Sequence, residues 1–295
     1  MNPFFSIVIP TYNRALLVRE CIHSALAQSF GNFEVVVVDD GSNDNTESVV
    51  REIPSEKVRY FKKENGERGA ARNYGIEKAK GEYVVFMDSD DQMEINHLLV
   101  LYTHLLQQQE DFVATKYFFF YDQGRFDAND VKKLSEGYHG FKTFLIGNPM
   151  ACYFTIRRMN PDLILFREEL KYTIMEDWIF LMENLQVSRL YVINEFTMGM
   201  REHDSRSMRG SADKIISARR NALIYLTEKI AFCEEDREIL IGNSDYFCAV
   251  HSYIGGNIRA GFQYLLTHVE LNGLSFKSTV LFIKMCFRVI WRKKA

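Results

Sequence analysis

Short apolar segments alternate with amphipathic segments in the first part of the chain. Residues 5–10, 32–40 and 82–88 are rich in β-branched or aromatic side chains and are apolar at successive positions. This pattern is typical of strands that are buried on both faces, as in parallel sheets. The intervening segments carry apolar residues at helical spacing, which predicts helices over 15–29, 45–53 and 70–79.

Polar side chains follow each of these predicted strands at the point where the strand ends. The segments are 11–14 (TYNR), 39–42 (DDGS) and 88–91 (DSDD). Strands that alternate with helices form βαβ units with a parallel sheet, and the carboxyl ends of parallel strands meet at one edge. Ligands of such sheets bind beyond that edge. The sequence therefore predicts an α/β fold with a polar site where these three segments converge.

The rest of the chain continues this pattern and then becomes helical. The pattern predicts a leucine-rich helix over 96–109 and an aromatic strand over 112–121. It then predicts a helix that begins with acids over 175–186 and another strand over 190–196. After about Gly210, long periodic segments cover 213–233 and 245–268. We therefore predict an α/β domain over 1–210 and a helical region over 211–295, because domains of these sizes are common.

Charge and cysteine content narrow the function classes. Among 295 residues, 36 Lys and Arg stand against 39 Asp and Glu, a net charge of -3 that gives no electrostatic basis for binding nucleic acid. The five cysteines are widely spaced and include no CxxC pair, a pattern that fits a reducing cytosol better than secretion or a thiolate zinc site. No signal-peptide pattern and no apolar run of ~20 residues is present, so we expect a cytoplasmic protein.

The three polar segments contain side chains suited to a nucleotide and a metal ion. Carboxylates such as those of DSDD are the oxygen ligands that Mg²⁺ and Mn²⁺ prefer. Tyr12 is able to stack on a base, and Arg14, Arg68 and Arg72 are able to complement phosphate charge. Each has an alternative interpretation, since acidic turns cap helices and arginines solvate surfaces.

Four segments in familiar order carry a family resemblance. SIVIPTYNR (6–14), FEVVVVDDGSNDNT (33–46), NGERGAARNYGIEKAKGEYVVFMDSDD (65–91) and MEDWIFL (175–181) resemble family 2 glycosyltransferases. The resemblance implies the GT-A fold, a Rossmann-like and mostly parallel sheet flanked by helices, here with a helical C-terminal extension. It also implies a nucleotide-sugar donor, expected to be UDP-linked, and a divalent metal, Mn²⁺ or Mg²⁺.

Other enzyme classes with similar signals fit less well. A haloacid dehalogenase loop needs Thr or Val at position 92, where Gln92 stands. A sugar nucleotidyltransferase needs a Gly-rich N-terminal phosphate loop, and a dehydrogenase needs GxGxxG after the first strand; PTYNR occupies that place.

The resemblance assigns roles to individual residues of this chain. It implies that Asp90 is the direct metal ligand and that Asp91 supports the loop. The residues it places around the nucleotide and its ribose are Pro10, Thr11, Tyr12, Arg14, Asp40, Gly41, Arg72, Asn73, Asp88 and Ser89.

The resemblance also implies a general base and a late loop. Asp177, in the Glu176-Asp177 pair, matches the base that removes the proton of the acceptor hydroxyl, whose pKa is far above 7. Single displacement by that hydroxyl inverts the anomeric configuration. In the loop 201–207, Arg201 and Arg206 are expected to neutralise the leaving group, and His203 to bind the metal. The alternatives are helix-capping acids and an exposed histidine, and Met200 replaces the aromatic residue usual in the family.

The acceptor side and the C-terminus leave alternatives open. Residues 148–153 and Trp178 are either an acceptor platform or core. The segment from Leu271 to Ala295, which includes the candidate membrane-contacting part Ser278–Ala295, has no acid, and on a helix its basic residues Lys277, Lys284, Arg288 and Arg292 share one face. Such a helix either lies on the anionic inner face of the cytoplasmic membrane, where each basic residue contributes about 1 kcal/mol, or packs on the domain.

The whole-chain prediction is an inverting, metal-dependent glycosyltransferase that transfers a sugar to a glycan or lipid-linked acceptor in surface polysaccharide synthesis. The alternative is a non-catalytic or regulatory homologue that retains the nucleotide-sugar pocket.

Overall fold

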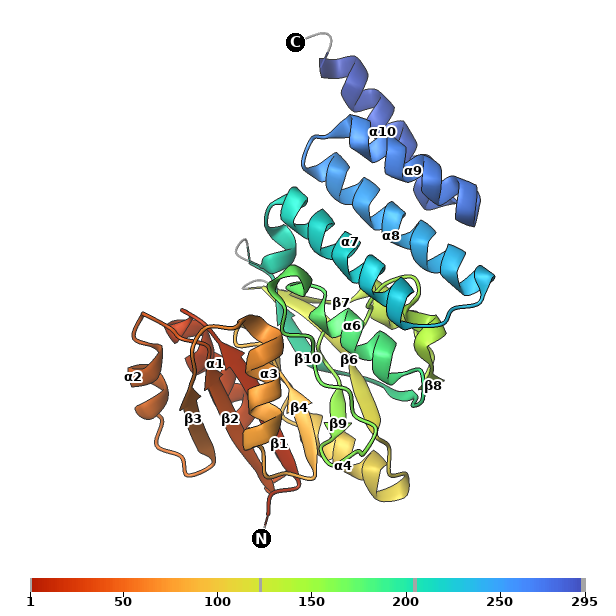
Figure 1. The fold of residues 1–295 in the computed structure, drawn as a ribbon. Coiled ribbons are helices and arrows are strands. Elements are labelled where there is room, and N and C mark those ends of the chain that lie inside the picture. Colours follow the sequence, from red (N-terminus) through yellow and green to blue (C-terminus); the bar gives the residue numbers. More distant parts are fainter. Residues whose placement is uncertain (1, 122–123, 204–205, 293–295) are drawn as a thin grey trace.

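A computed structural model describes residues 2–121, 124–203 and 206–292. One mixed sheet with flanking helices forms the N-terminal part, and four helices, α7 (Ala212–Lys229), α8 (Glu234–Ile254), α9 (Ile258–Asn272) and α10 (Phe276–Arg292), extend from it (Figure 1). The helix α10 lies at the far end from the N-terminus (Figure 1). The predicted α/β fold with a helical C-terminal extension is therefore confirmed.

Four parallel strands form one half of the sheet, in the order β3-β2-β1-β4. These strands are β3 (Val58–Lys62), β2 (Phe33–Asp39), β1 (Phe5–Thr11) and β4 (Tyr83–Phe86). The register pairs Thr11 with Asp39, and Val8 pairs with Phe86 in β4. Because the three strands run in step, their polar ends lie at one edge, as the sequence predicts. The edge strand β3 is only partly buried and is absent from the sequence prediction.

Short antiparallel strands join this half to a second parallel pair. β9 (Thr155–Arg157) pairs antiparallel with both β4 and β6 (Phe112–Tyr121), and β6 runs parallel to β10 (Leu190–Arg201). The remaining strands are β5 (Gln92–Met93), β7 (Gly124–Asp127) and β8 (Gly137–His139). β5, β7, β8 and β9 have two to four residues each, too few to show a periodic pattern.

Strand β10 is longer than its sequence pattern predicts. It continues past residue 196 to Arg201 through register shifts between Ile193 and Phe196 and between Phe196 and Met198. Bulges of this kind re-aim the strand. The added residues of β10 pair antiparallel with β5, and β5 directly follows the DSDD segment in the sequence. The loop after β10 is thereby held beside the acidic segment.

Helices cover the sheet and supply the rest of the main core. They are α1 (Ala15–Leu26), α2 (Thr46–Arg51), α3 (Glu67–Lys78), α4 (His97–Gln107), α5 (Asn129–Lys132) and α6 (Glu176–Asn184). Three short 3₁₀ turns add Phe141–Phe144, Leu170–Tyr172 and Ser207–Arg209. Helix α3 approaches β1 closely at Gly75, where an added Cβ would lie 2.3 Å from Val8 Cγ1.

The C-terminal helices continue the main core and then build a second one. Ile215 and Leu226 of α7 and Leu240 of α8 belong to the main apolar cluster, while Leu281 and Met285 of α10 lie in a smaller cluster with α8 and α9. The domain boundary at 210/211 stays a prediction. The main apolar cluster contains residues from both sides of it.

One helix prediction is wrong. The periodic segment 245–268 is two helices, because the chain turns at Gly255–Asn257. Gly256 adopts a φ of 83°, and the Asn257 side chain caps α9 by accepting from the Ala260 N–H at 3.2 Å.

Helix α10 packs on its neighbours and also exposes apolar side chains. Ser278, Leu281 and Met285 are buried, whereas Phe282 and Phe287 are 51% and 59% exposed. Residues 293–295, including the basic Lys293 and Lys294, lie outside the described residues. Within the described chain, none of the helices combines the length and apolarity needed to cross a membrane.

Candidate active site

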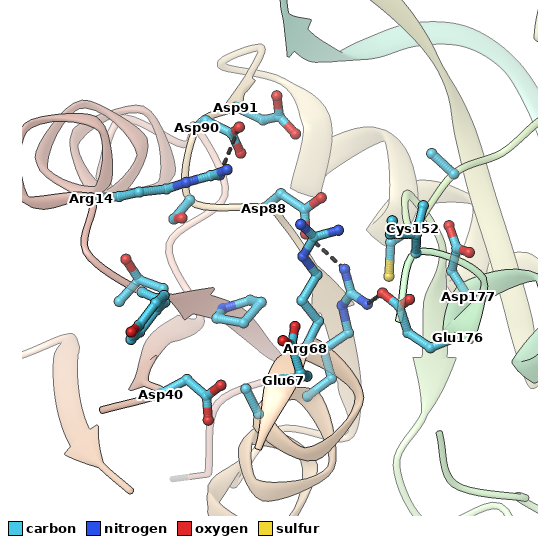
Figure 2. A pocket seen from close by; sticks show the side chains of 18 of the residues that line it. Arg14, Asp40, Glu67, Arg68, Asp88, Asp90, Asp91, Cys152, Glu176 and Asp177 are labelled. Carbon is cyan, nitrogen blue, oxygen red and sulfur yellow. Dashed lines mark hydrogen bonds and ion pairs between the residues drawn. The ribbon is translucent and has the colours of Figure 1, made fainter. Parts of the chain in front are cut away.

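A cavity of about 380 Å³ opens at the carboxyl edge of β1, β2 and β4 (Figure 2). The predicted site residues that line it are Pro10, Thr11, Tyr12, Arg14, Asp40, Arg72, Asp88, Ser89, Asp90, Asp177 and Arg206. Gly41, Asn73, Arg201 and His203 do not line it. Residues from Pro10 to Arg206, far apart in the sequence, therefore share one cavity.

The loops after β1 and β2 are tied into one wall. Ser42 Oγ accepts from the Asn13 N–H at 2.8 Å, and Asn13 Oδ1 accepts from the Asn43 N–H at 2.8 Å. Buried Asp39 holds the turn by accepting from the Ser42 N–H at 2.7 Å. Gly41 follows with a φ of 85°, which an L side chain rarely adopts.

Asp40, not Asp39, faces the cavity. Its Oδ1 accepts from Lys63 Nζ at 2.8 Å and from the Gly66 N–H at 3.0 Å. The ring of Tyr12, nearby on the same wall, is 45% exposed and open to stacking. This wall has the hydrogen-bonding and stacking groups that suit a base and ribose.

A buried arginine links the acidic segment to helix α6. Arg72 donates from Nη2 to Asp88 Oδ1 at 2.8 Å and from Nη1 to Glu176 Oε1 at 2.7 Å. Burial raises the pKa of Asp88, but the charges of Arg72 and Arg68 outweigh it and lower the pKa below its usual range. Arg72 therefore holds two motifs together from the floor of the cavity.

Asp90 and its neighbours could hold a metal ion. Carboxylate oxygens of Asp88, Asp90 and Asp91 lie within 4.8 Å of one another. Asp90 Oδ2 pairs with Arg14 Nη1 at 2.7 Å and with His203 Nε2 at 2.8 Å. Oxygen ligands and an imidazole at this separation fit a divalent cation.

Asp91 supports the loop, as predicted. It is buried and accepts from the Arg201 N–H at 2.9 Å and from the Tyr153 hydroxyl. Burial and the charge of Asp90 raise its pKa well above the usual range. Asp91 therefore joins the acidic segment to β10 and to the loop before β9.

Asp177 stands in the first turn of α6, at the side of the cavity. It is partly exposed, and its Oδ1 accepts from the Trp178 N–H at 2.7 Å. Burial, with the charge of Glu176, raises the pKa of Asp177 to about 7, while Arg72 opposes the shift. A carboxylate with such a pKa accepts a proton effectively near neutral pH.

The family model for glycosyl transferase family 2 matches residues 6–163. The chain belongs to glycosyltransferase family 2. An uncharacterized glycosyltransferase of Rickettsia typhi is 34% identical over 217 residues, which are 70% of this chain and 66% of the relative. The chain thus spans slightly less than two thirds of that relative's length.

Solved structures show the same fold. Staphylococcus aureus TarS 1–349 in complex with UDP-GlcNAc matches with a TM-score of 0.70 and 20% identity, over 96% of this chain and 88% of TarS 1–349. Mannosyltransferase PcManGT of Pyrobaculum calidifontis, in complex with GDP-Man and Mn²⁺, matches with a TM-score of 0.63 and 16% identity, over 98% and 81% of the two chains.

Two residues that the sequence analysis assigned to the nucleotide-sugar bind other parts of this glycosyltransferase in the structure. Arg201 pairs with Glu20, donates from Nε to the Asp90 carbonyl oxygen at 3.2 Å and lies over the Phe120 ring. The Asn73 amide donates to the carbonyl oxygen of Phe166 at 2.9 Å and fixes the segment before α6. Both residues position neighbouring segments here.

Arg206 and Trp178 also have defined places. Arg206 lines the cavity and pairs with Glu202. Trp178 is 1% exposed and donates from Nε1 to the Phe144 carbonyl oxygen at 2.8 Å, so it is core and not an acceptor platform. Of the segment 148–153, residues 151–153 line the cavity.

Backbone strain surrounds the glycosyltransferase cavity. Among the described non-glycine residues, positive φ values occur at Asn13, Glu67, Ala151 and Ile174, and the last three line the cavity. Strained residues of this kind gather at functional sites. The sequence analysis included Ala151 in the candidate acceptor segment 148–153 but missed Ile174, because no residue type at position 174 signals the conformation.

Proposed function

We propose that this family 2 glycosyltransferase transfers a sugar from a nucleotide-sugar, expected to be UDP-linked, to a hydroxyl group with inversion at the anomeric carbon. One observation carries the proposal: Asp177, a carboxylate with a pKa of about 7, lines the same cavity as Asp88 and Asp90. UDP-GlcNAc bound to TarS supports the choice of donor class.

A divalent metal fits the acidic side of this cavity. Asp90, with His203 beside it, would hold the ion after Arg14 releases the Asp90 carboxylate. When bound, the ion supplies positive charge to the diphosphate leaving group. Mn²⁺ in the PcManGT complex supports Mn²⁺ or Mg²⁺.

The chain's own residues then account for the transfer. The acceptor oxygen attacks the anomeric carbon, its proton passes to Asp177, and the bond from that carbon to the diphosphate oxygen breaks. Arg206 and Arg14, which line the cavity, would contact the departing diphosphate. Because attack and departure occur on opposite faces in one step, the configuration inverts.

A donor screen tests this function. Nucleotide-sugars at 100 times their Kd should raise the unfolding free energy by about 2.7 kcal/mol, measured as a thermal shift with Mn²⁺. We expect EDTA to abolish most of the shift. Release of nucleoside diphosphate should then identify the donor and the inverted product should be visible by NMR. Binding without any release of nucleoside diphosphate would instead favour the non-catalytic homologue.

The acceptor is proposed to be lipid-linked, as in surface polysaccharide synthesis, with the enzyme working at the inner face of the cytoplasmic membrane. Helix α10 supports this, because Phe276, Phe282 and Phe287 are exposed and exposed Lys277 and Lys284 accompany them. Arg288 instead turns to the Tyr253 carbonyl oxygen of α8, so the predicted basic face is divided. Apolar side chains with flanking lysines suit an anionic bilayer.

Vesicle flotation tests the membrane contact. The double variant Phe282→Ser/Phe287→Ser should reduce binding to phosphatidylglycerol-containing vesicles at least about tenfold, because burial of each Phe contributes about 1.5–3 kcal/mol. Leu266→Ser is the matched control, since Leu266 is 61% exposed on α9. These substitutions leave the buried side of α10 intact, unlike a truncation at Ser278. Wild-type protein that stays unbound, or equal binding by the double variant, would contradict the proposal.

A further inference from the structure

A buried arginine of the helical region lies against the helix that carries the proposed base. Arg219 of α7 is 2% exposed, and its guanidinium carbon lies 3.5 Å from the centre of the Trp178 ring. Trp178 directly follows Asp177, and its N–H donates to Asp177 Oδ1. Helices α6 and α7 pack side by side (Figure 1).

The charge of Arg219 has no carboxylate partner among the described residues. Its Nε donates to the neutral Ser244 hydroxyl at 3.2 Å, and Nη2 has no hydrogen-bond partner. The Phe247 ring covers the guanidinium at 5.1 Å. A buried, unpaired cation is costly, so a packing role alone accounts poorly for it. An apolar side chain of similar volume would pack there without that cost.

The neighbouring arginine, Arg220, differs from Arg219 because it has a carboxylate partner. Arg220, also on α7, is partly exposed and pairs with Asp245 of α8 at 3.2 Å. Arg219 lies instead against the ring of Trp178, the residue after Asp177, and Asp177 is one of the charges that act on it. Burial lowers the pKa of Arg219 to about 9, and Cys248 and Asp177 oppose that shift. Arg219 is therefore still a cation at neutral pH.

We propose that Arg219 is a positioning residue for the reaction, which holds Trp178 by stacking and stabilises the ionised form of Asp177 through space. This inference rests on the proposed role of Asp177 as the base. It makes the helical region part of the catalytic apparatus, because Ser244 and Phe247 of α8 hold the guanidinium in place.

Several other titratable or charged groups interact electrostatically with Asp177, and the test has to leave them unchanged. They are Glu176 on α6, Arg72 on α3, Asp88 after β4, Tyr117 on β6 and Cys152 before β9. Arg72 resembles Arg219 most closely, since it is also a buried arginine that contacts α6, through the Glu176 carboxylate. None of these groups is altered by substitution of Arg219.

Titration of the metal-free protein by NMR tests the electrostatic part directly. The side-chain carboxyl carbon of Asp177, labelled with ¹³C and assigned by its loss in Asp177→Asn, reports the pKa. Arg219→Met should raise this pKa by about half a unit, since one charge is lost in a partly buried setting. Arg219→Lys, which keeps the charge, should restore most of the value. Arg220→Met is the matched control and should leave it unchanged.

Turnover tests the positioning part, with the donor that the screen identifies. Arg219→Met should lower kcat about tenfold, leave the donor KM nearly unchanged and move the acid limb of the pH profile upward. An unchanged Asp177 titration in Arg219→Met would overturn the inference, as would equal effects of Met and Lys. If Asp177→Asn retains full activity, the proposed base is wrong instead, and the NMR titration still reports on Arg219.

Discussion

Asp177→Asn is expected to lower kcat by about 10²- to 10⁴-fold, because the amide has no capacity to take the acceptor proton. The donor thermal shift with Mn²⁺ should persist, since the predicted nucleotide and metal residues Tyr12, Asp40 and Asp90 are unchanged. Release of nucleoside diphosphate in the presence of acceptor is the measurement. Asp162→Asn, outside the cavity lining, is a matched control. Normal transfer by Asp177→Asn would remove Asp177 from the mechanism.

The same carboxylate sets the expected pH dependence. Burial and Glu176 raise the pKa of Asp177 to about 7, and only the ionised form acts as a base. The rate should therefore fall about tenfold per pH unit below about 7. Asp177→Asn should lose this limb along with its activity. A wild-type rate that stays constant down to pH 5 would contradict the assignment.

Stability provides a folding control for this variant. A carboxyl group whose pKa is higher in the folded than in the unfolded state stabilises the fold when protonated, and this contribution is lost as pH rises through the folded value of about 7. At pH 8 the ionised Asp177 is thus unfavourable to folding. The melting temperature of Asp177→Asn at pH 8 should equal or exceed that of wild type, which separates lost chemistry from lost structure.

Arg72→Met should have the largest effect on stability. Arg72 is 1% exposed and bridges Asp88 and Glu176, so its removal leaves the buried Glu176 carboxylate and the partly exposed Asp88 carboxylate without their partner. Breaking such a buried pair costs about 3–5 kcal/mol, a large share of the ~5–15 kcal/mol that stabilises a typical domain. Urea unfolding at pH 7 should show this loss as a lower midpoint.

Two further measurements test the stabilising role of Arg72: unfolding at low pH and unfolding of a double variant. Because the pKa of Asp88 is lowered in the folded state, its contribution to stability is present above pH 4 and disappears as pH falls further. The difference between wild type and Arg72→Met should shrink at low pH. Arg72→Met/Glu176→Gln should recover part of the lost stability by removing one stranded charge. An unchanged urea midpoint in Arg72→Met would show that the bridge is not structural.

The structure gives the physical reason for roles that the sequence alone assigns only by family resemblance. Asp39 and Asp40 lie together in one turn, and hydrogen bonds show that Asp39 holds the turn while Asp40 faces the cavity. Asp90 and Asp91 are adjacent acids, and the bonds from the Arg201 N–H and the Tyr153 hydroxyl explain why Asp91 supports the loop. Adjacent residues in a turn direct their side chains to different sides of the backbone. The sequence pattern does not show which of these sides faces the ligand.

The sequence by itself determined the α/β fold, the convergence of three strand ends and the family. The fold and the convergence follow because apolar periodicity specifies buried strands and parallel strands in step bring their ends to one edge, whereas the family follows from four motifs in a familiar order. The tertiary structure alone decided the Arg72 bridge between Asp88 and Glu176, and the contact of Arg219 with Trp178. Those partners lie far apart in the chain, and their pairing depends on how helices α3, α6 and α7 pack, which local residue patterns do not encode.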